Sequence, residues 1–517
     1  MEAAEQSIPR QRSLRWAIAG TFLLFFSFCI GIALTRAPWY DEGFLANPPY
    51  SLDTTGHPGV SIIDDSGPFI PATHLEPVKG IRTRMYLEMP IHTIALAAWF
   101  KVFGFSLLSG RLFTVLCGAC VLFSWYTIVG RLTSDWVVAA AALFLLAGDY
   151  GFVLRASEIR MDALSAAFGF GGLALYLKLR ERSFSWAIFW SHLCIAASGL
   201  THPNGGLLSL AGLVFLTLYY DWSRIAVRHF LIAFGPYLIG AIGWGWYIAQ
   251  DVESFKSQFI MNAQFGGRLE TFSAPLLNIK REILLRYLSV LGGLGDSSIL
   301  SKLKLFIVLV YFAGVVGVLS IEALRRQKGY RALLLLTGIY FLVLAFTDGR
   351  KSQTYVVHVI PLFTALAAAT AVYLWRKRVP ALRAVIAAAT GILMLIHTGG
   401  TAYQVRNNSY HRQYLPAISF LKQNLRDDQL LIGPGVLGIG LKYPPNLMDD
   451  FRLGALNGKL PDWIVINEWY ENWFLGLKAS EPPTYAFVRN RLANEFTTVY
   501  NQGGFIIYRR NQAPSAH

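Results

Sequence analysis

Charged residues are scarce in this chain. Asp, Glu, Lys and Arg make up 15% of its 517 positions, whereas hydrophobic residues make up 54%. A soluble protein of this length needs more polar residues to cover its surface, so a soluble fold is excluded. The apolar residues lie in long runs, which is typical of helices that span a membrane. The sequence therefore predicts a polytopic α-helical membrane protein.

Cysteine is also scarce. The four cysteines, Cys29, Cys117, Cys120 and Cys194, all lie inside apolar runs. Cys117 and Cys120 have CxxC spacing, but no second pair of Cys or His residues lies near them. We interpret all four as packing residues.

Other signatures are missing as well. The chain has no internal repeat of fixed period and no low-complexity tract. Residues Gly433 to Gly438 match GxGxxG superficially, but Pro434 and the lack of a convincing helix after it argue against dinucleotide binding. The net charge of +15 comes mostly from short basic clusters between apolar runs, a pattern that indicates membrane topology rather than nucleic-acid binding.

The N-terminal segment predicts a retained first span. Arg10, Arg12 and Arg15 precede the apolar run Trp16 to Thr35, which is too long for a signal-peptide core and has no small-residue cleavage site. We expect the chain to start in the cytoplasm. Eleven spans are predicted in all, at about 15–35, 111–130, 134–150, 162–178, 186–200, 206–221, 229–249, 304–323, 332–347, 355–375 and 383–402.

The segment from Met89 to Phe103 is apolar but shorter than the roughly 20 residues that a crossing needs. If it crossed, four basic clusters would face outward; if it lies along the surface, all four share the cytoplasmic side with the N-terminus. We therefore predict an interfacial helix here. The clusters are Lys178/Arg180/Arg182, Arg224/Arg228, Arg325/Arg326/Lys328/Arg331 and Arg376/Lys377/Arg378.

This topology divides the chain into two domains. Residues 1–402 form the transmembrane domain, whose outer loop 36–110 carries the interfacial helix and candidate catalytic residues. Residues 403–517 regain polar residues, Pro and Gly, and predict a small extracytoplasmic α/β domain. Its expected strands are 429–432, 463–466, 497–500 and 505–509, with helices at 415–425 and 485–494.

The outer loop begins with Pro38-Trp39-Tyr40-Asp41-Glu42. Adjacent carboxylates at a membrane boundary are costly to desolvate and are not needed for folding, which favours a functional role. Asp41 and Glu42 suit a general base for an acceptor hydroxyl, a divalent metal site, or an ion pair that anchors the loop.

A second polar cluster runs from Arg155 to Asp162 and contains Glu158 and Arg160. Glu158 and Asp162 are four residues apart and would share one helical face. The cluster is predicted to orient Asp41 or to bind substrate, the alternative being capping charges that reach to water.

The third cluster is Asp348 to Tyr355, in which Arg350 and Lys351 lie on the outer side against the positive-inside rule. A phosphate at headgroup level would explain them, and Arg82 and Arg84 fit the same anion site. The alternative is contact with anionic lipids in general. His57, Asp64 and Asp65 suit turns and solvation, although His57 is also a candidate for substrate contact. His358 and His397 suit packing within spans.

These motifs, taken in order, carry a resemblance. The chain resembles membrane glycosyltransferases of the GT-C fold in three motifs. They are the aromatic-flanked Asp41-Glu42 after the first span, the segment Tyr86-Leu87-Glu88-Met89-Pro90 that opens an amphipathic helix ending at Phe103-Gly104, and Gly110-Arg111-Leu112. Arg160 to Leu164 and Tyr355 with Pro361 match in order and spacing. The resemblance covers about residues 15–400 and is nearest the branch with protein O-mannosyltransferases and the lipid A aminoarabinose transferase.

The resemblance implies transfer of a sugar, with inversion, from a polyprenyl-phosphate donor to a lipid, lipid-linked glycan or protein acceptor. It implies a site on the outer side of the membrane, in a bacterium the periplasmic side of the inner membrane, and no required cofactor. Asp41 would be the base, Asp162 the second acid, and Arg350 or Lys351 would bind the departing phosphate. The aminoarabinose branch tends to carry Lys where this chain has Met89 and His202, so Arg82, Arg84 or His202 are alternative phosphate ligands.

The expected site is therefore a set of three groups. Catalytic residues are Asp41, Glu42 and Asp162; donor-phosphate residues are Arg82, Arg84, Arg350, Lys351 and Tyr355; substrate-binding residues are His57, Tyr86, Glu88, Glu158, Arg160 and His202. Alternative functions are a lipid-phosphate transferase that moves a non-sugar group and a transporter or flippase. A transporter is expected to show repeated halves and ionisable residues near the bilayer midplane.

Overall fold

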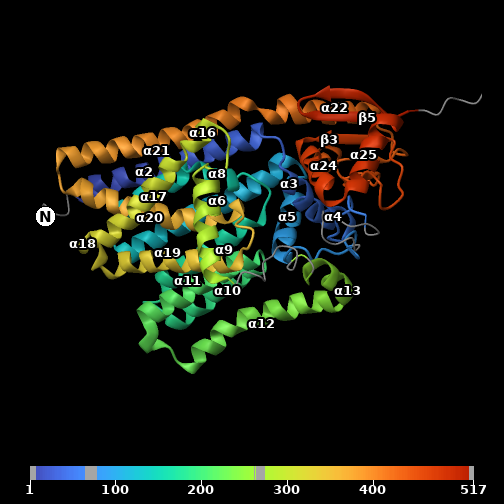
Figure 1. Ribbon diagram of the computed structural model, residues 1–517. Coiled ribbons are helices and arrows are strands. Elements are labelled where there is room, and N and C mark those ends of the chain that lie inside the picture. Colours follow the sequence, from blue (N-terminus) through green and yellow to red (C-terminus); the bar gives the residue numbers. More distant parts are fainter. Residues whose placement is uncertain (1–6, 65–77, 261, 263–273, 512–517) are drawn as a thin grey trace, which may run out of the picture.

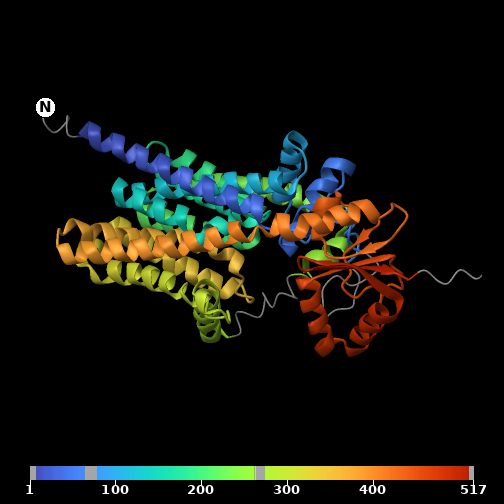
Figure 2. The same cartoon turned by 90° about the horizontal axis from the view of Figure 1, so that it is seen from above.

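The computed structural model describes residues 7–64, 78–260, 262 and 274–511. A bundle of long helices forms one part of the molecule, and a smaller sheet-containing domain caps one end of it (Figures 1 and 2). The bundle helices are α2 (Ser7–Thr35), α6 (Leu107–Thr133), α7 (Trp136–Gly148), α9 (Met161–Leu179), α10 (Phe184–Gly199), α11 (Pro203–Asp221), α12 (Val227–Ala249), α17 (Leu305–Ser320), α19 (Lys328–Thr347), α20 (Val356–Arg376) and α21 (Pro380–Asn407).

Each of the eleven predicted spans corresponds to one of these helices. Seven helical stretches of the described chain are long and apolar enough to cross a membrane. These seven are Arg12–Thr35, Leu107–Thr133, Pro203–Arg224, Val227–Ala249, Lys328–Thr347, Gln353–Arg376 and Pro380–Asn424. The remaining four, α7, α9, α10 and α17, are shorter or less apolar and pack against longer neighbours. The fold is thus a polytopic helical membrane protein, as predicted.

One of the predicted basic clusters begins at α18 (Glu322–Arg325), which lies at the end of the bundle where α2 begins (Figure 1). Arg376, after α20, pairs with Asp135 between α6 and α7. Arg180, after α9, pairs with Asp221 at the end of α11. That all the clusters share the cytoplasmic side stays a prediction.

Short helices lie at the opposite end. They are α3 (Tyr40–Leu45), α4 (Asn47–Thr55), α5 (Pro90–Phe103), α8 (Tyr150–Arg155), α13 (Val252–Phe255), α15 (Pro275–Arg281), η4 (Glu282–Leu291) and η5 (Gln353–Tyr355). The predicted interfacial helix is α5, which runs across the end of the bundle in Figure 1. Its buried Leu96 and Phe100 belong to the same apolar cluster as residues of the C-terminal domain. It therefore joins the two parts of the molecule.

The C-terminal domain contains a five-stranded sheet in the order β2-β1-β3-β5-β4. Strands β1, β2 and β3 are parallel, whereas β5 pairs antiparallel with β3 and β4. One face packs on α24 and α25 and the other on α22 and α23. The elements are α22 (Leu415–Asn424), β1 (Leu431–Ile432), α23 (Val436–Leu441), β2 (Leu447–Met448), β3 (Trp463–Asn467), α24 (Glu468–Ser480), α25 (Pro482–Glu495), β4 (Phe496–Gln502) and β5 (Phe505–Arg510).

All four expected strands and both expected helices are present, whereas α23, β2 and α24 were not foreseen. The expected domain boundary at residue 402 falls inside α21. α21 ends at Asn407, Asn408 adopts a left-handed conformation, and the chain then continues through the π-helical turn η6 (Tyr410–Tyr414) into α22.

The C-terminal domain docks directly on α3. A Cβ added to Gly43 would lie 2.3 Å from the backbone nitrogen of Val436, so only glycine permits this approach. The Tyr443 hydroxyl donates to the Gly43 carbonyl oxygen at 2.7 Å, and the Asp449 N–H donates to the Ile62 carbonyl oxygen at 2.8 Å. The helix that carries Asp41 is thus held between the bundle and the sheet domain.

Cysteine labelling tests the orientation. In a cysteine-free background, a membrane-impermeant maleimide added from outside is expected to label Asp53→Cys on α4 and not Gln327→Cys before α19. Both positions are exposed in the structure, so access depends only on the side of the membrane. Labelling of Gln327→Cys alone would refute the eleven-span arrangement.

Gly43→Ala tests the domain contact. The added methyl group meets backbone atoms that cannot move aside, so we expect a loss of about 1–3 kcal/mol in stability. Limited proteolysis should release the C-terminal domain more readily than in the wild type. Gly235→Ala in α12 is the matched control, because a Cβ there meets no atom within 4 Å. Equal protease sensitivity of both variants would contradict the proposed contact.

Candidate active site

Asp41, Arg160 and Asp162 form one row of charges at the outer end of the bundle. Asp41 lies in the first turn of α3 and Asp162 in the first turn of α9, where a carboxylate is favoured by the helix dipole. Arg160 lies between them: its Nη1 donates to Asp41 Oδ2, and its Nε donates to Asp162 Oδ2 at 2.8 Å. The structure therefore brings together three predicted residues from two distant segments.

The two carboxylates differ in exposure. The side chain of Asp162 is 2% exposed and that of Asp41 is 39% exposed. Asp162 Oδ1 is buried and accepts no hydrogen bond from the described residues. Asp41 is thus accessible to a reactant, whereas Asp162 holds Arg160 and has one oxygen left for a hydrogen-bond donor.

Burial is the main influence on the Asp41 carboxyl and raises its pKa above the usual value. Arg160 opposes this shift, while the negative charges of Glu158 and Asp162 add to it. A carboxylate with a raised pKa is a stronger base, which suits removal of a proton from a hydroxyl group.

Glu42 is fully buried and all its oxygen positions are engaged. Arg111 of α6 donates to it through Nε at 2.9 Å and through Nη2 at 2.7 Å. The backbone N–H groups of Trp39 and Ile159 each donate to it at 2.9 Å. These contacts match the loop-anchoring alternative, since they tie α3, α6 and the segment before α9 together.

The observed contacts of Asp41 and Glu42 do not fit a divalent cation. The Glu42 oxygens are taken by four N–H donors, and Asp41 faces the Arg160 cation. Across the part of the chain that the structure describes, no three His, Cys, Asp or Glu side chains are grouped so as to hold a metal ion.

Glu158 is buried between two arginines. Arg36 and Arg155 both donate to it, the latter at 2.6 Å. Burial alone would raise the pKa of Glu158, but Arg155 and Arg36 outweigh it and lower the pKa. The guanidinium groups of Arg155 and Arg160 lie over the Trp39 ring, with centroid distances of 5.5 and 5.2 Å. Glu158 thus fixes the arginines around the Asp41 loop.

Further polar residues lie beyond Asp162. His202 caps α11, and its Nε2 lies 3.3 Å from the Tyr355 hydroxyl. The Arg286 guanidinium lies over the Tyr355 ring at 5.8 Å and donates to Asp348 Oδ2 at 2.8 Å. The predicted His202 and Tyr355 therefore meet, in a cluster that also includes an arginine from η4.

Sequence reasoning missed Arg286. It lies in an outer loop against the positive-inside rule, as Arg350 does, so the argument applied to Arg350 would have identified it. Lys351 is buried beside it: Nζ donates to the Ala345 carbonyl oxygen at 2.6 Å and lies 3.4 Å from Glu282. Arg350 is exposed on the same turn.

Five other predicted residues lie along a separate surface formed by the outer loop, α5 and α12. Arg84 donates to Gln250 at 2.8 Å and Tyr86 donates to the Tyr247 carbonyl oxygen at 2.9 Å. Glu88 lines a groove there. His57 and Arg82 are exposed on the outer loop. Asp64 pairs with Lys459 of the C-terminal domain at 2.9 Å, and Asp65 lies outside the described residues.

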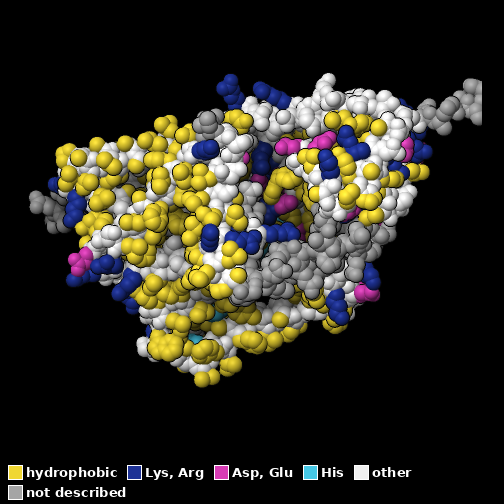
Figure 3. All heavy atoms as spheres, viewed as in Figure 1, with side chains coloured by type: hydrophobic (Ala, Val, Ile, Leu, Met, Phe, Trp, Pro, Cys, Tyr) yellow, Lys and Arg dark blue, Asp and Glu magenta, His cyan; other side chains and the backbone are white. Residues whose placement is uncertain are grey.

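The surface is hollowed between the bundle and the C-terminal domain, and basic and acidic side chains gather around this hollow (Figure 3). The bundle surface in the same view is largely hydrophobic. Trp469 and Trp473 of α24 reach the Asp41 helix, with ring centroids 5.9 and 6.1 Å from that of Tyr40. The C-terminal domain therefore contributes side chains next to the candidate base.

No family model and no curated protein matches this sequence. Solved structures do. ArnT from Cupriavidus metallidurans bound to undecaprenyl phosphate matches with a TM-score of 0.60 at 14% identity, over 95% of this chain and 97% of that one. An oligosaccharyltransferase from Archaeoglobus fulgidus, in complex with Zn and sulfate, matches with a TM-score of 0.56 at 13% identity, over 94% of this chain and 73% of that one.

The chain has the GT-C fold. The match extends over nearly the full length of ArnT, so it includes the C-terminal domain as well as the bundle. The GT-C architecture predicted from the order of the motifs is thereby confirmed.

Arg160 variants test the electrostatics of Asp41. A base must be ionised, so activity is lost as the pH falls through the pKa of Asp41. Arg160→Gln removes the charge that lowers this pKa and should move the acidic limb of kcat/KM to higher pH. Arg160→Lys keeps the charge and should move it far less. Both variants should remain folded by circular dichroism. Equal shifts of the acidic limb in the two variants would contradict the assignment of this limb to Asp41.

Proposed function

We propose that this protein is an inverting glycosyltransferase. It would move a sugar from a polyprenyl-phosphate donor to a hydroxyl group of a lipid, lipid-linked glycan or protein at the outer face of a bacterial cytoplasmic membrane. The observation that carries the proposal is the row Asp41, Arg160 and Asp162 at the outer end of a GT-C bundle. Similar structures bind undecaprenyl phosphate and a dolichol-phosphate, which supports a lipid-phosphate donor.

The proposed step assigns a role to each side chain. Asp41 accepts the proton of the acceptor hydroxyl as its oxygen forms a bond to the anomeric carbon. The bond between that carbon and the phosphate oxygen breaks on the opposite face, and its electron pair leaves with the phosphate. Arg160 keeps Asp41 in place, and the free Oδ1 of Asp162 accepts a hydrogen bond from a substrate hydroxyl.

The departing phosphate gains negative charge, so a nearby cation or hydrogen-bond donor lowers the barrier. His202, Tyr355 and the exposed Arg350 are the proposed ligands for it. Lys351 and Arg286 are held by Glu282 and Asp348, so we assign them to supporting this turn. Glu42 is assigned to anchoring the loop through Arg111.

A transporter has less support. Its ionisable groups would be needed near the middle of the membrane, whereas the ion pairs described above lie at the two ends of the bundle. The carboxylate row at one end suits a reaction at the membrane surface.

Asp41→Asn tests the proposal directly. Purified protein in nanodiscs is incubated with radiolabelled polyprenyl-phosphate sugars and membrane lipid acceptors, with a divalent cation and, in parallel, with EDTA; we expect equal turnover in both. Removal of the base should lower turnover by about 100- to 10,000-fold. Asp53→Asn, an exposed carboxylate on α4, is the matched control and should retain full activity. Normal turnover of Asp41→Asn would remove Asp41 from the base role.

A further inference from the structure

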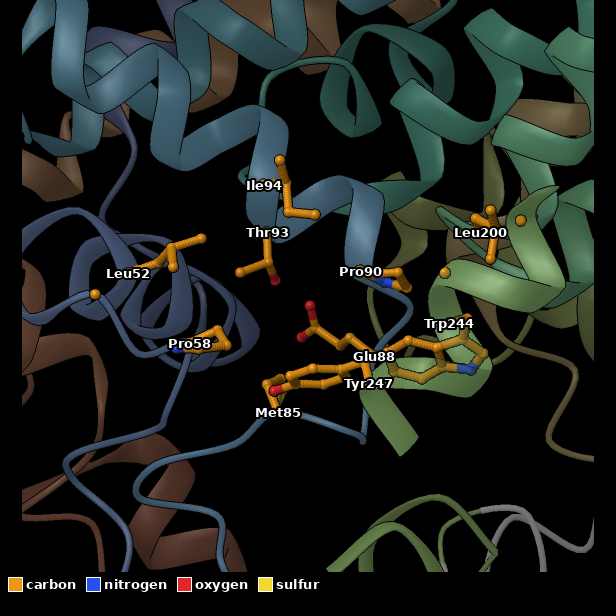
Figure 4. Close-up of a pocket in the computed structure, with 13 residues that line it drawn as sticks. Leu52, Pro58, Met85, Glu88, Pro90, Thr93, Ile94, Leu200, Trp244 and Tyr247 are labelled. Carbon is orange, nitrogen blue, oxygen red and sulfur yellow. The ribbon is translucent and has the colours of Figure 1, made fainter. Parts of the chain in front are cut away.

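A groove of about 520 Å³ lies under α5, separate from the Asp41 row (Figure 4). It is bounded by α5, the outer loop and α12, and its walls include Ile94, Leu200, Trp244 and Tyr247. Neither Asp41 nor Asp162 lines it. Leu200 is two residues from His202, so the groove adjoins the proposed reaction site without being part of it.

Two polar side chains point into this apolar space (Figure 4). Glu88 is 6% exposed and Thr93 is 4% exposed. Both carboxylate oxygens of Glu88 and the Thr93 hydroxyl are buried and have no hydrogen-bond partner among the described residues. His92 Nδ1 lies 3.7 Å from Glu88 Oε2, beyond hydrogen-bond distance. Burying a polar group without a hydrogen-bond partner costs free energy, which indicates that a ligand supplies the missing partners.

The charge of the groove limits what that ligand can be. Among the described residues that line the groove, Glu88 is the one that carries a charge, and none is Lys or Arg. Arg84 lies over the Tyr247 ring, but its guanidinium donates to Gln250 and faces Asp251. A phosphate in the groove would therefore meet the Glu88 carboxylate, and His92, the basic side chain beside it, faces Glu88 Oε2 at 3.7 Å and does not line the groove. The groove should reject anions.

The partners that remain are hydroxyl and ammonium groups, and the geometry favours hydroxyl. An ammonium group only donates hydrogen bonds, whereas the Thr93 hydroxyl also needs a group that accepts its proton. A sugar hydroxyl can donate to Glu88 and accept from Thr93. The rings of Trp244 and Tyr247 offer flat apolar surfaces for the C–H face of a sugar or for a hydrocarbon chain.

We infer that this groove binds an uncharged, hydroxyl-bearing amphiphile, with its hydroxyl groups at Glu88 and Thr93 and its apolar chain along α12. The inference deepens the proposed function. Only the identification of this ligand as the acceptor rests on that function. The donor carries its sugar on a phosphate, which the groove rejects.

Gly243 provides a way to block the groove. It lines the groove on α12, and a Cβ added there meets no atom within 4 Å. A leucine at this position would fill the space without moving the backbone. Gly235 lies on the same helix, has equal room for a side chain and does not line the groove, so Gly235→Leu is a matched control.

The experiment measures binding rather than transfer, so its result is independent of the sugar-transfer assay. Full-length protein in nanodiscs is photo-crosslinked with an alkyl glucoside that carries a diazirine on its chain. Unlabelled dodecyl glucoside, dodecyl phosphate and dodecylammonium are the competitors. We expect crosslinks to α5 or α12, competition by the glucoside, and at least a tenfold loss of labelling in Gly243→Leu but not in Gly235→Leu.

Glu88→Leu supplies the test of selectivity. It removes the buried charge, so dodecyl phosphate should begin to compete with the probe, which it does not do in the wild type. Competition by dodecyl phosphate in the wild type would overturn the inference in favour of an anionic ligand. Stronger competition by dodecylammonium than by the glucoside would overturn it in favour of an amine. Equal loss of labelling in both glycine variants would show that the groove is not the binding site.

Discussion

The Arg111 to Glu42 ion pair is the contact on which the candidate site depends. Both side chains are fully buried, and Arg111 also donates to the carbonyl oxygens of Ala33, Arg36 and Ala37 at the end of the first span. Removing either partner would leave a buried charge, at a cost of about 3–5 kcal/mol. The pair joins α2, α3 and α6, and Glu42 adds the segment before α9. Asp41 is adjacent in sequence, so this pair determines where its carboxylate lies.

The bundle alone does not complete the surroundings of Asp41. Tyr40 contacts two tryptophans of α24, and Gly43 lies against the backbone before α23. The Asp449 carboxylate accepts hydrogen bonds from the Tyr470 hydroxyl and the Gly435 N–H, and its burial raises its pKa to about 6. The C-terminal domain is therefore a structural part of the site rather than an appendage.

Much of this arrangement could be predicted from the sequence. Long apolar runs identify the spans, and the charge clusters orient them, because both depend on local composition and on the membrane. Asp41, Arg160 and Asp162 could be selected because charges at a membrane boundary are costly without a role. Sequence could not distinguish Asp41 from Glu42, since the difference arises from Arg111, 69 residues away. Arg286 could have been selected by the positive-inside argument used for Arg350, whereas its contact with Asp348, 62 residues away, could not be read from the sequence.

A helical connection, broken at the left-handed residue Asn408, joins α21 of the membrane bundle through η6 to α22 of the sheet domain. Together with the contacts at Gly43 and Ile62, it holds the sheet domain at a fixed angle over the bundle. Admission of reactants by outward swinging of that domain would require breaking all of these contacts. Under the proposed function, we therefore expect lipid-borne substrates to enter laterally from the bilayer, between helices, while the sheet domain stays in place above the site.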